Sequence, residues 1–306
     1  MKPVRIATRK SDLALWQARH VAGRIEAELG RPAELLPMVT AGDRLHDISL
    51  AKHGGKGLFV KEIEAALLDG RADVAVHSAK DLPAESPDGL VLAAIPTRAD
   101  PRDALVATGA ASLARLPAGT RVGTGSLRRR AQLARARPDL EILPLRGNVP
   151  TRLRKLDAGE VDALVLASAG LERLSLTARI GERIDPELLL PAVGQGALAI
   201  QARRDDPLAG DLAALGDAET SVCLRAERAC LARLGADCSV PLGAYAELDG
   251  PRLALRARLF SPDGEICLAE SLAGRAEDAE ALGREAAEAL LGAGGEALLA
   301  RLRIDP

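Results

Sequence analysis

Aromatic side chains are almost absent from this sequence, which has one Trp, one Tyr and two Phe among 306 residues. Any hydrophobic core must therefore be built from Leu, Val, Ile and Ala, and the 47% hydrophobic fraction supplies these amply. Proteins that bind nucleic acid by stacking use aromatic platforms and a basic excess. This chain has neither, since its formal net charge is −2, so we expect no nucleic-acid partner.

Long apolar runs are also missing. No stretch of about 18 apolar residues is present, so we expect no transmembrane helix and no membrane partner. The sequence opens on Met-Lys-Pro-Val-Arg-Ile-Ala-Thr-Arg, a strand-like pattern without the apolar core of a signal peptide. We therefore expect a cytoplasmic protein whose thiols are reduced.

Cysteine is scarce, and its four copies form no CxxC pair and no cluster with histidine. We therefore expect no metal site of the structural zinc type. Cys223 and Cys230 lie on one predicted helix and are expected to face a core, while Cys267 lies in an alternating strand. Cys238 differs from these three, because it lies in a loop between a helix and the next strand.

Strand-like and helix-like segments alternate up to about residue 200, which favours parallel-rich α/β layers. The predicted strands are Val4–Thr8, Glu34–Val39, Asp73–His77, Leu90–Ile95, Ala104–Ala107, Thr120–Gly123, Ile142–Leu145 and Ala163–Leu166. After about residue 217 the pattern changes to an amphipathic helix, antiparallel strands and a helical segment interrupted near Gly292–Gly295. This change predicts a small α+β domain in which helices cover one face of an antiparallel sheet.

Two segments, Pro96–Arg102 and Pro191–Ala197, break the alternation, and we interpret each as a crossing between two similar lobes. A cleft between lobes is a favoured place for a ligand. The predicted domains are a first lobe over 1–96 and 197–214, a second lobe over 97–196, and a C-terminal domain over 217–306.

The segment Ala72–Pro83 joins a short apolar strand pattern directly to four polar residues. These are His77, Ser78, Lys80 and Asp81. In open α/β sheets, ligands bind just beyond the carboxyl ends of strands. A cation and a carboxylate placed there can bind an anion and stabilise a developing positive charge. The alternative is a strand-end turn with a solvated ion pair, which contributes little.

Five turns marked by glycine or serine carry cations, and four of them follow a predicted strand directly. They are Thr8–Ser11, Lys52–Gly57, Ser78–Asp81, Gly123–Arg129 and Arg146–Arg152. Ser11, Ser126 and Thr151 are natural N-caps, so helix N-termini are expected to join the cations. A capped helix with surface arginines explains any one turn, but five in two lobes predict a cleft for a ligand with many negative groups. The turns match no Walker or dinucleotide-binding pattern, and arginine suits carboxylate and phosphate equally.

Longer motifs follow one another in order along essentially the whole chain. They are Arg5–Ser11, Leu13–Ala18, Pro37–Thr40, Gly54–Glu62, Ala75–Pro83, Asp100–Ala104, Ser126–Arg129, Leu145–Val149, Pro191–Ala197 and the Cys238 loop with Val240–Gly243 after it. Each is weak alone, but all of them in order are very specific. On these motifs the sequence resembles the hydroxymethylbilane synthases, a family also called the porphobilinogen deaminases.

The resemblance implies a transferase of porphyrin and heme biosynthesis. The family joins four porphobilinogen molecules head to tail with loss of ammonia, and water then releases the linear tetrapyrrole hydroxymethylbilane. Its dipyrromethane cofactor is held by a thioether to one cysteine, which corresponds to Cys238 in the C-terminal domain. The resemblance also implies two doubly wound lobes like those of periplasmic solute-binding proteins, and a monomer.

The resemblance also assigns roles to individual residues. Asp81 matches the catalytic acid, which handles protons and cationic charge during each addition. The residues implied to hold the cofactor's carboxylates are Lys80, Ser126, Arg128, Arg129, Arg146 and Arg152. Those implied to serve the substrate or the growing chain are Arg9, Ser11, Phe59, Arg173 and Gln195. Lys52 and Lys56 correspond to a mobile loop, around residues 42–57, and Arg98 at the first crossing is a further implied contact.

Three positions depart from the family's commonest pattern. Gly125 stands where serine is usual, and Pro150 and Asp237 stand where glycine is usual. Proline is acceptable at the start of a helix. A carboxylate at position 237 should raise the pKa of the neighbouring Cys238 thiol and slow cofactor attachment.

A two-lobed solute-binding protein is the main alternative, because fold does not decide function. Such a protein would need a secretion signal, which we do not find. It would not need Asp81, a loop cysteine or a third domain.

Overall fold

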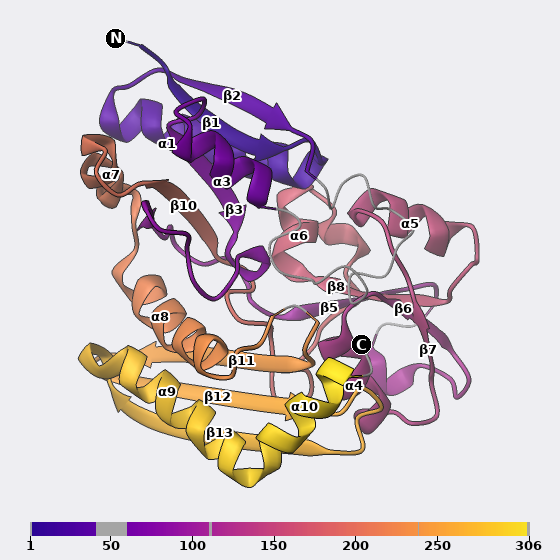
Figure 1. Cartoon of the computed structure of the whole chain (residues 1–306). Coiled ribbons are helices and arrows are strands. Elements are labelled where there is room, and N and C mark those ends of the chain that lie inside the picture. Colours follow the sequence, from indigo (N-terminus) through magenta and orange to yellow (C-terminus); the bar gives the residue numbers. More distant parts are fainter. Residues whose placement is uncertain (1, 41–59, 110–111, 238, 305–306) are drawn as a thin grey trace.

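The computed structural model describes residues 2–40, 60–109, 112–237 and 239–304. Within these ranges it contains three β-sheets with helices packed against them (Figure 1). No helix in this part of the chain is long and apolar enough to cross a membrane.

The first sheet has the strand order β2-β1-β3-β10-β4. Its strands are β1 (Val4–Arg9), β2 (Ala33–Met38), β3 (Val74–Ser78), β4 (Leu90–Ala94) and β10 (Leu198–Arg203). β1 runs parallel to β2 and β3, whereas β10 runs antiparallel to β3 and β4. Alternate residues of β1 face opposite sides, so Ile6 packs with α1 (Asp12–Leu29) and Ala7 packs with α3 (Lys61–Leu68). Helix α7 (Pro207–Leu212) joins the α1 side.

The second sheet has the order β7-β6-β8-β5-β9. Its strands are β5 (Asp103–Ala107), β6 (Arg121–Thr124), β7 (Glu141–Pro144), β8 (Ala163–Ala167) and β9 (Glu182–Arg183). β6 runs parallel to β7 and β8, and β5 runs antiparallel to β8 and β9. The three parallel strands lead into α4 (Leu127–Ala136), α5 (Val149–Asp157) and α6 (Ser168–Arg173).

The two sheets therefore share one plan. Each has three parallel strands, and next to them lies an antiparallel strand that enters after one of the two crossings: β5 follows the first crossing and β10 the second. The predicted fold class, two doubly wound α/β lobes with a small α+β domain, is confirmed. The predicted strand list missed β10, which joins the first sheet from far along the chain. The domain boundaries themselves stay a prediction.

The third sheet is antiparallel and consists of β11 (Leu242–Asp249), β12 (Arg252–Phe260) and β13 (Cys267–Arg275). Helices α8 (Ala218–Arg233) and α9 (Ala279–Leu290) pack their buried residues against it in one core. A π-helical turn, Leu291–Gly295, separates α9 from α10 (Glu296–Ile304), and Gly294 there has a φ of 109°. The interruption predicted near Gly292–Gly295 is confirmed.

A buried ion pair ties both crossings to this third sheet. Arg98 Nη1 of the first crossing lies 2.6 Å from Glu227 Oε1 of α8. The Glu227 carboxylate is fully buried and also accepts the backbone N–H groups of Gly194, at 2.7 Å, and Ala246, at 2.9 Å. Gly194 belongs to the second crossing and Ala246 to β11. Arg98, which the resemblance implied as a ligand contact, is paired with a carboxylate of the protein.

We expect Arg98→Met to lower the free energy of unfolding by about 3–5 kcal/mol, because the variant leaves the Glu227 carboxylate buried without its cation. Urea denaturation near pH 7 measures the change. The matched control is Arg233→Met, which removes an exposed pair with Glu288 and should cost less than about 1 kcal/mol. Equal losses in the two variants would contradict this account of the crossing.

Candidate active site

The turn after β3 is fixed from two sides. Strand β3 ends at Ser78, and the short 3₁₀ helix η2 (Ala79–Asp81) follows. Ser78 Oγ accepts a hydrogen bond from Gln17 Nε2 of α1 at 2.8 Å, and Ala79 N donates to Ala197 O of the second crossing at 3.0 Å. The turn therefore presents Asp81 as an exposed residue, while Lys80 next to it is half-buried.

Asp81 lines a small pocket beyond the carboxyl ends of β1 and β3. Arg9 and Ser11 line the same pocket, so the structure brings together a cation, a hydroxyl and a carboxylate that the sequence placed in separate turns. Ser11 is the N-cap of α1, as predicted, and its hydroxyl accepts the N–H of Ala14. The N-terminal end of α1 therefore adds its partial positive charge to that of Arg9.

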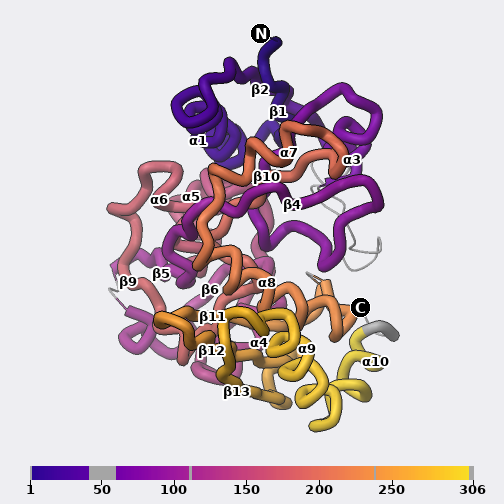
Figure 2. Tube along the Cα trace, turned by 90° about the vertical axis from the view of Figure 1, so that its left-hand side faces the viewer, coloured from indigo at the N-terminus to yellow at the C-terminus, as the bar shows by residue number. Residues whose placement is uncertain are grey.

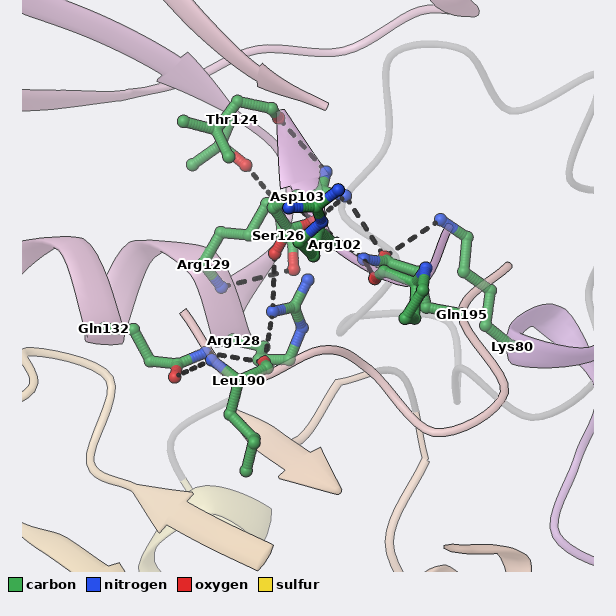
Figure 3. Close-up of polar contacts among 12 residues, drawn as sticks. Lys80, Arg102, Asp103, Thr124, Ser126, Arg128, Arg129, Gln132, Leu190 and Gln195 are labelled. Atoms are coloured by element: carbon green, nitrogen blue, oxygen red, sulfur yellow. Dashed lines mark hydrogen bonds and ion pairs between the residues drawn. The ribbon is translucent and has the colours of Figure 1, made fainter. Parts of the chain in front are cut away.

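A second group of charges is centred on Asp103, the first residue of β5, which is fully buried (Figure 3). Its carboxylate lies 2.8 Å from Arg128 Nη1 and 2.7 Å from Arg129 Nη2, both of α4. Burial alone would raise the pKa of Asp103, but the two guanidiniums hold it well below its usual range. Ser126 caps α4 as predicted, by accepting the N–H of Arg129.

Gln195 of the second crossing connects Asp103 to Lys80 (Figure 3). Its Nε2 donates to Asp103 Oδ1 at 2.9 Å and to Pro101 O at 2.7 Å. Its Oε1 accepts from Arg129 Nη2 at 3.3 Å and from Lys80 Nζ at 3.5 Å. One amide thus contacts both Lys80, in the turn after β3 of the first sheet, and Arg129, on helix α4 of the second sheet.

We call Lys80, Arg128, Arg129 and Arg152 the cation cluster. Burial, and next to it the charge of Arg129, lower the pKa of Lys80 to about 8 and that of Arg152 to about 10. The Nε atoms of Arg128 and Arg152 are buried and have no hydrogen-bond partner among the described residues. Asp103 is the one carboxylate buried among these four cations, and the exposed Asp81 also acts on Lys80, so the cluster keeps a net positive charge. The cluster is therefore suited to a ligand with several carboxylates.

The prediction that Thr151 caps α5 is wrong. The cap is Asn148, whose side-chain oxygen accepts the Thr151 N–H at 2.9 Å. Pro150 lies in the first turn of the helix, where its missing N–H leaves no bond unmade, so the helix starts before Thr151. Arg146, in the turn ahead of this cap, is exposed.

Arg173 of α6 reaches the first lobe. Its Nη2 donates to Gly196 O of the second crossing at 2.7 Å, and its guanidinium carbon lies 5.9 Å from the centre of the Trp16 ring on α1. The Trp16 ring in turn stacks on His20, with centroids 5.2 Å apart. Burial lowers the pKa of Arg173 to about 10. Arg173 therefore sits as a largely desolvated cation between α1 and the crossing.

A polar array lies beneath the Asp81 turn. His77 Nε2 is 3.1 Å from Gln201 Oε1 of β10, and Gln201 Nε2 donates to Glu64 Oε1 of α3 at 3.1 Å. Burial lowers the pKa of His77 to about 4 and raises that of Glu64. A neutral imidazole can donate from Nε2 to the amide oxygen, so the array joins β3, β10 and α3.

Several of these residues carried no assignment from the sequence. Asp103, Gln17 and Gln201 all hold site residues or their strands in place. Asp103 alone had a feature in the local sequence that could have revealed its role, since it is a charged residue at the start of an otherwise apolar strand. Gln17 and Gln201 gave none, because their partners lie at least 61 positions away along the chain.

Cys238, Lys52, Lys56 and Phe59 lie outside the described residues. Next to Cys238, the Asp237 carboxylate accepts the N–H of Ser239 at 2.8 Å. Cys223 and Cys230 are buried in the C-terminal core, as predicted. Burial raises the pKa of these two thiols to about 11 and about 12.

Two family models match the chain. The model of the porphobilinogen deaminase dipyrromethane cofactor binding domain matches residues 4–210, and that of the porphobilinogen deaminase C-terminal domain matches residues 221–292. This chain belongs to the porphobilinogen deaminase family. The family resemblance read from the sequence motifs is thereby confirmed.

Solved structures of periplasmic proteins are also similar to this porphobilinogen deaminase family member. An ABC transporter periplasmic substrate-binding protein from Coxiella burnetii is 13% identical, with 69% of this chain and 91% of that chain covered and a TM-score of 0.44. Immunogenic lipoprotein A from Vibrio vulnificus is 15% identical, with 69% and 94% covered and a TM-score of 0.43. The periplasmic aliphatic sulphonate binding protein SsuA from Escherichia coli is 17% identical, with 76% and 70% covered and a TM-score of 0.39.

The buried His77 predicts a specific loss of stability in acid. Its pKa is about 4 in the folded protein and 6.5 when unperturbed, so the unfolded state takes up the proton first. The free energy of unfolding should therefore fall as the pH drops from 6.5 towards 4, by roughly 2–3 kcal/mol from this group. We expect His77→Asn to lose this part of the pH dependence, measured by urea denaturation at about pH 7 and pH 4.5.

The control for this experiment is His20→Asn, since His20 is exposed on α1. That variant should keep most of the wild-type acid sensitivity. If His77→Asn and the wild type lost equal stability between the two pH values, the buried neutral state of His77 would be ruled out.

Proposed function

We propose that this chain is a hydroxymethylbilane synthase. It joins four porphobilinogen molecules head to tail with release of ammonia, and hydrolysis then frees the linear tetrapyrrole for porphyrin and heme biosynthesis. Membership of the porphobilinogen deaminase family supports the reaction class. The strongest structural support for the proposal is the cation cluster, which has one internal carboxylate and two guanidinium N–H groups without a hydrogen-bond partner among the described residues.

The cluster fits a dipyrromethane, because each pyrrole unit carries an acetate and a propionate. We propose that six residues hold these carboxylates: Lys80, Ser126, Arg128, Arg129, Arg146 and Arg152. Charge-assisted bonds to carboxylates would satisfy the buried Nε atoms of Arg128 and Arg152. When bound, the cofactor supplies the pyrrole carbon to which the first substrate is joined. Its proposed thioether is to Cys238, which follows from the family resemblance.

Asp81 is proposed to act on the substrate in the pocket beside Arg9 and Ser11. Ammonia leaves when the C–N bond of the aminomethyl group breaks, and the methylene carbon is left electrophilic and cationic. The exposed Asp81 carboxylate can stabilise that charge and then accept the proton released when the new carbon–carbon bond forms. Lys80, although adjacent, is directed to Gln195 and belongs to the anchoring set.

The substrate's own carboxylates are proposed to bind Arg9, Ser11 and Arg173, with Phe59 stacking near a pyrrole ring. Arg173 is desolvated between the lobes, so a carboxylate there would gain a strong partner. Gln195, also assigned to the substrate by the resemblance, contacts Lys80 and Arg129 and is proposed to position them. Lys52 and Lys56 are proposed to act from the loop around residues 42–57.

The family resemblance further supports a monomer that works in the cytoplasm. We propose that the first lobe spans 1–96 and 197–214 and the second lobe 97–196. The C-terminal domain, 217–306, would carry the cofactor cysteine.

Intact-mass spectrometry tests the cofactor. The purified active protein should exceed its 31.9 kDa chain by one dipyrromethane, and it should turn pink-red with an aldehyde reagent for pyrroles. Cys238→Ser should abolish the extra mass, whereas Cys223→Ser and Cys230→Ser should keep it. An active wild-type protein with the bare-chain mass would refute covalent attachment.

Steady-state kinetics test Asp81. We expect Asp81→Asn to lower kcat by about 10²–10⁴-fold, because the amide can neither carry the negative charge nor accept the proton. The variant should retain the cofactor mass, which shows that the cation cluster is intact. Asp88→Asn, which changes an exposed carboxylate between η2 and β4, is the control and should turn over normally. Near-normal turnover by Asp81→Asn would remove it from the catalytic role.

A further inference from the structure

A second, larger cavity lies between the first sheet and the C-terminal domain. It is a groove of about 710 Å³, within the size range of small-molecule sites. One wall is the edge strand β4 with Ile95 after it, and the other walls are helices α8 and α9; Figure 2 shows β4 above α8, with α9 beyond it. The groove shares no lining residue with the Asp81 pocket.

The walls are aliphatic with an excess of cations. Leu92, Leu224 and several alanines line the groove together with Arg225, Arg228 and Arg284. Of the acidic residues that line it, Glu280 pairs with Arg225 at 3.2 Å, and Asp217 caps the N-terminus of α8. Arg228 and Arg284, by contrast, form no salt bridge with a carboxylate among the described residues. The groove therefore combines an apolar surface with three arginines and two carboxylates, which leaves one net positive charge.

Of the two arginines without a salt bridge, Arg228 is the one with a buried N–H group that has no acceptor among the described residues. Its Nη2 donates to Ala84 O at 2.7 Å, while its Nη1 is shielded from solvent and has no acceptor among the described residues. Burial lowers its pKa. Arg228 is therefore a partly buried cation whose acceptor among the described residues is a neutral backbone carbonyl oxygen.

We propose that this groove binds a small amphipathic carboxylate, whose charge pairs with Arg228 and Arg284 and whose apolar body lies along the Leu92 and Leu224 walls. After a modest rotation of the Arg228 side chain, its Nη1 donates to the carboxylate of the bound molecule, which satisfies an N–H group that otherwise has no acceptor. The bound molecule contacts β4 of the first sheet and α8 of the C-terminal domain at once, so it holds the two together. This site is separate from the proposed catalytic pocket, and its binding does not rest on the proposed function.

The experiment uses the cofactor-containing protein and the fluorescent anion 8-anilinonaphthalene-1-sulfonate as a probe. Fluorescence titration should show saturable binding, octanoate should displace the probe, and octanol at equal concentration should displace it at least about tenfold less well. Arg228→Met should weaken probe binding about tenfold, because a charge-assisted bond is lost. Arg233→Met, on the same helix but outside the groove, should bind the probe as the wild type does.

Ala232→Leu provides a second variant, since it narrows the groove and keeps Arg228 in place. It should also weaken the probe about tenfold, and it replaces Arg228→Met if that variant does not melt cooperatively. Unchanged binding in the folded variants would overturn the proposal, as would equal displacement by octanol and octanoate. Displacement of the probe by porphobilinogen would place it in the catalytic pocket and would also overturn the proposal. The cofactor mass, measured separately, tells such a failure from a failure of the proposed function.

Discussion

The carboxylate of Asp103 makes the rest of the site possible. Two adjacent guanidiniums, those of Arg128 and Arg129, cannot be buried side by side without an anion, because each loses its hydration and repels the other. Asp103 contacts both and also accepts from Gln195. Because one carboxylate serves two arginines, the cluster can be buried and still remain positively charged. A second carboxylate at this point would lower that positive charge and weaken the attraction for an anionic ligand.

Glu227 is a second buried carboxylate that serves several partners, because it pairs with Arg98 and accepts two backbone N–H groups. Gln195 connects the two centres, because its side chain belongs to the Asp103 group and its carbonyl oxygen accepts from Arg98 Nε at 2.8 Å. The second crossing, through Gln195, therefore connects the anion site to the ion pair of Arg98 and Glu227. Any change in how the lobes sit would move the charges that hold the ligand.

Local patterns in the sequence predicted much of this. Apolar strands ending in cation-bearing turns, the serine caps at Ser11 and Ser126, and the glycine interruption of the last helix all depend on residues close together in the chain. The partnership of Arg98 with Glu227, 129 positions apart, has no local signature. Nor has the burial of His77, which lies in a run of polar residues but faces Gln201. Thr151 failed as a cap because an equally good cap, Asn148, precedes it.

The position of Trp16 has a practical consequence. It is the chain's one tryptophan, it belongs to α1 of the first sheet, and an arginine from the second sheet's α6 lies over its ring. All indole emission from this protein therefore originates beside a contact between the two lobes. The intrinsic fluorescence of Trp16 therefore reports on that contact, so the separation of the lobes could be followed in time without attaching a dye.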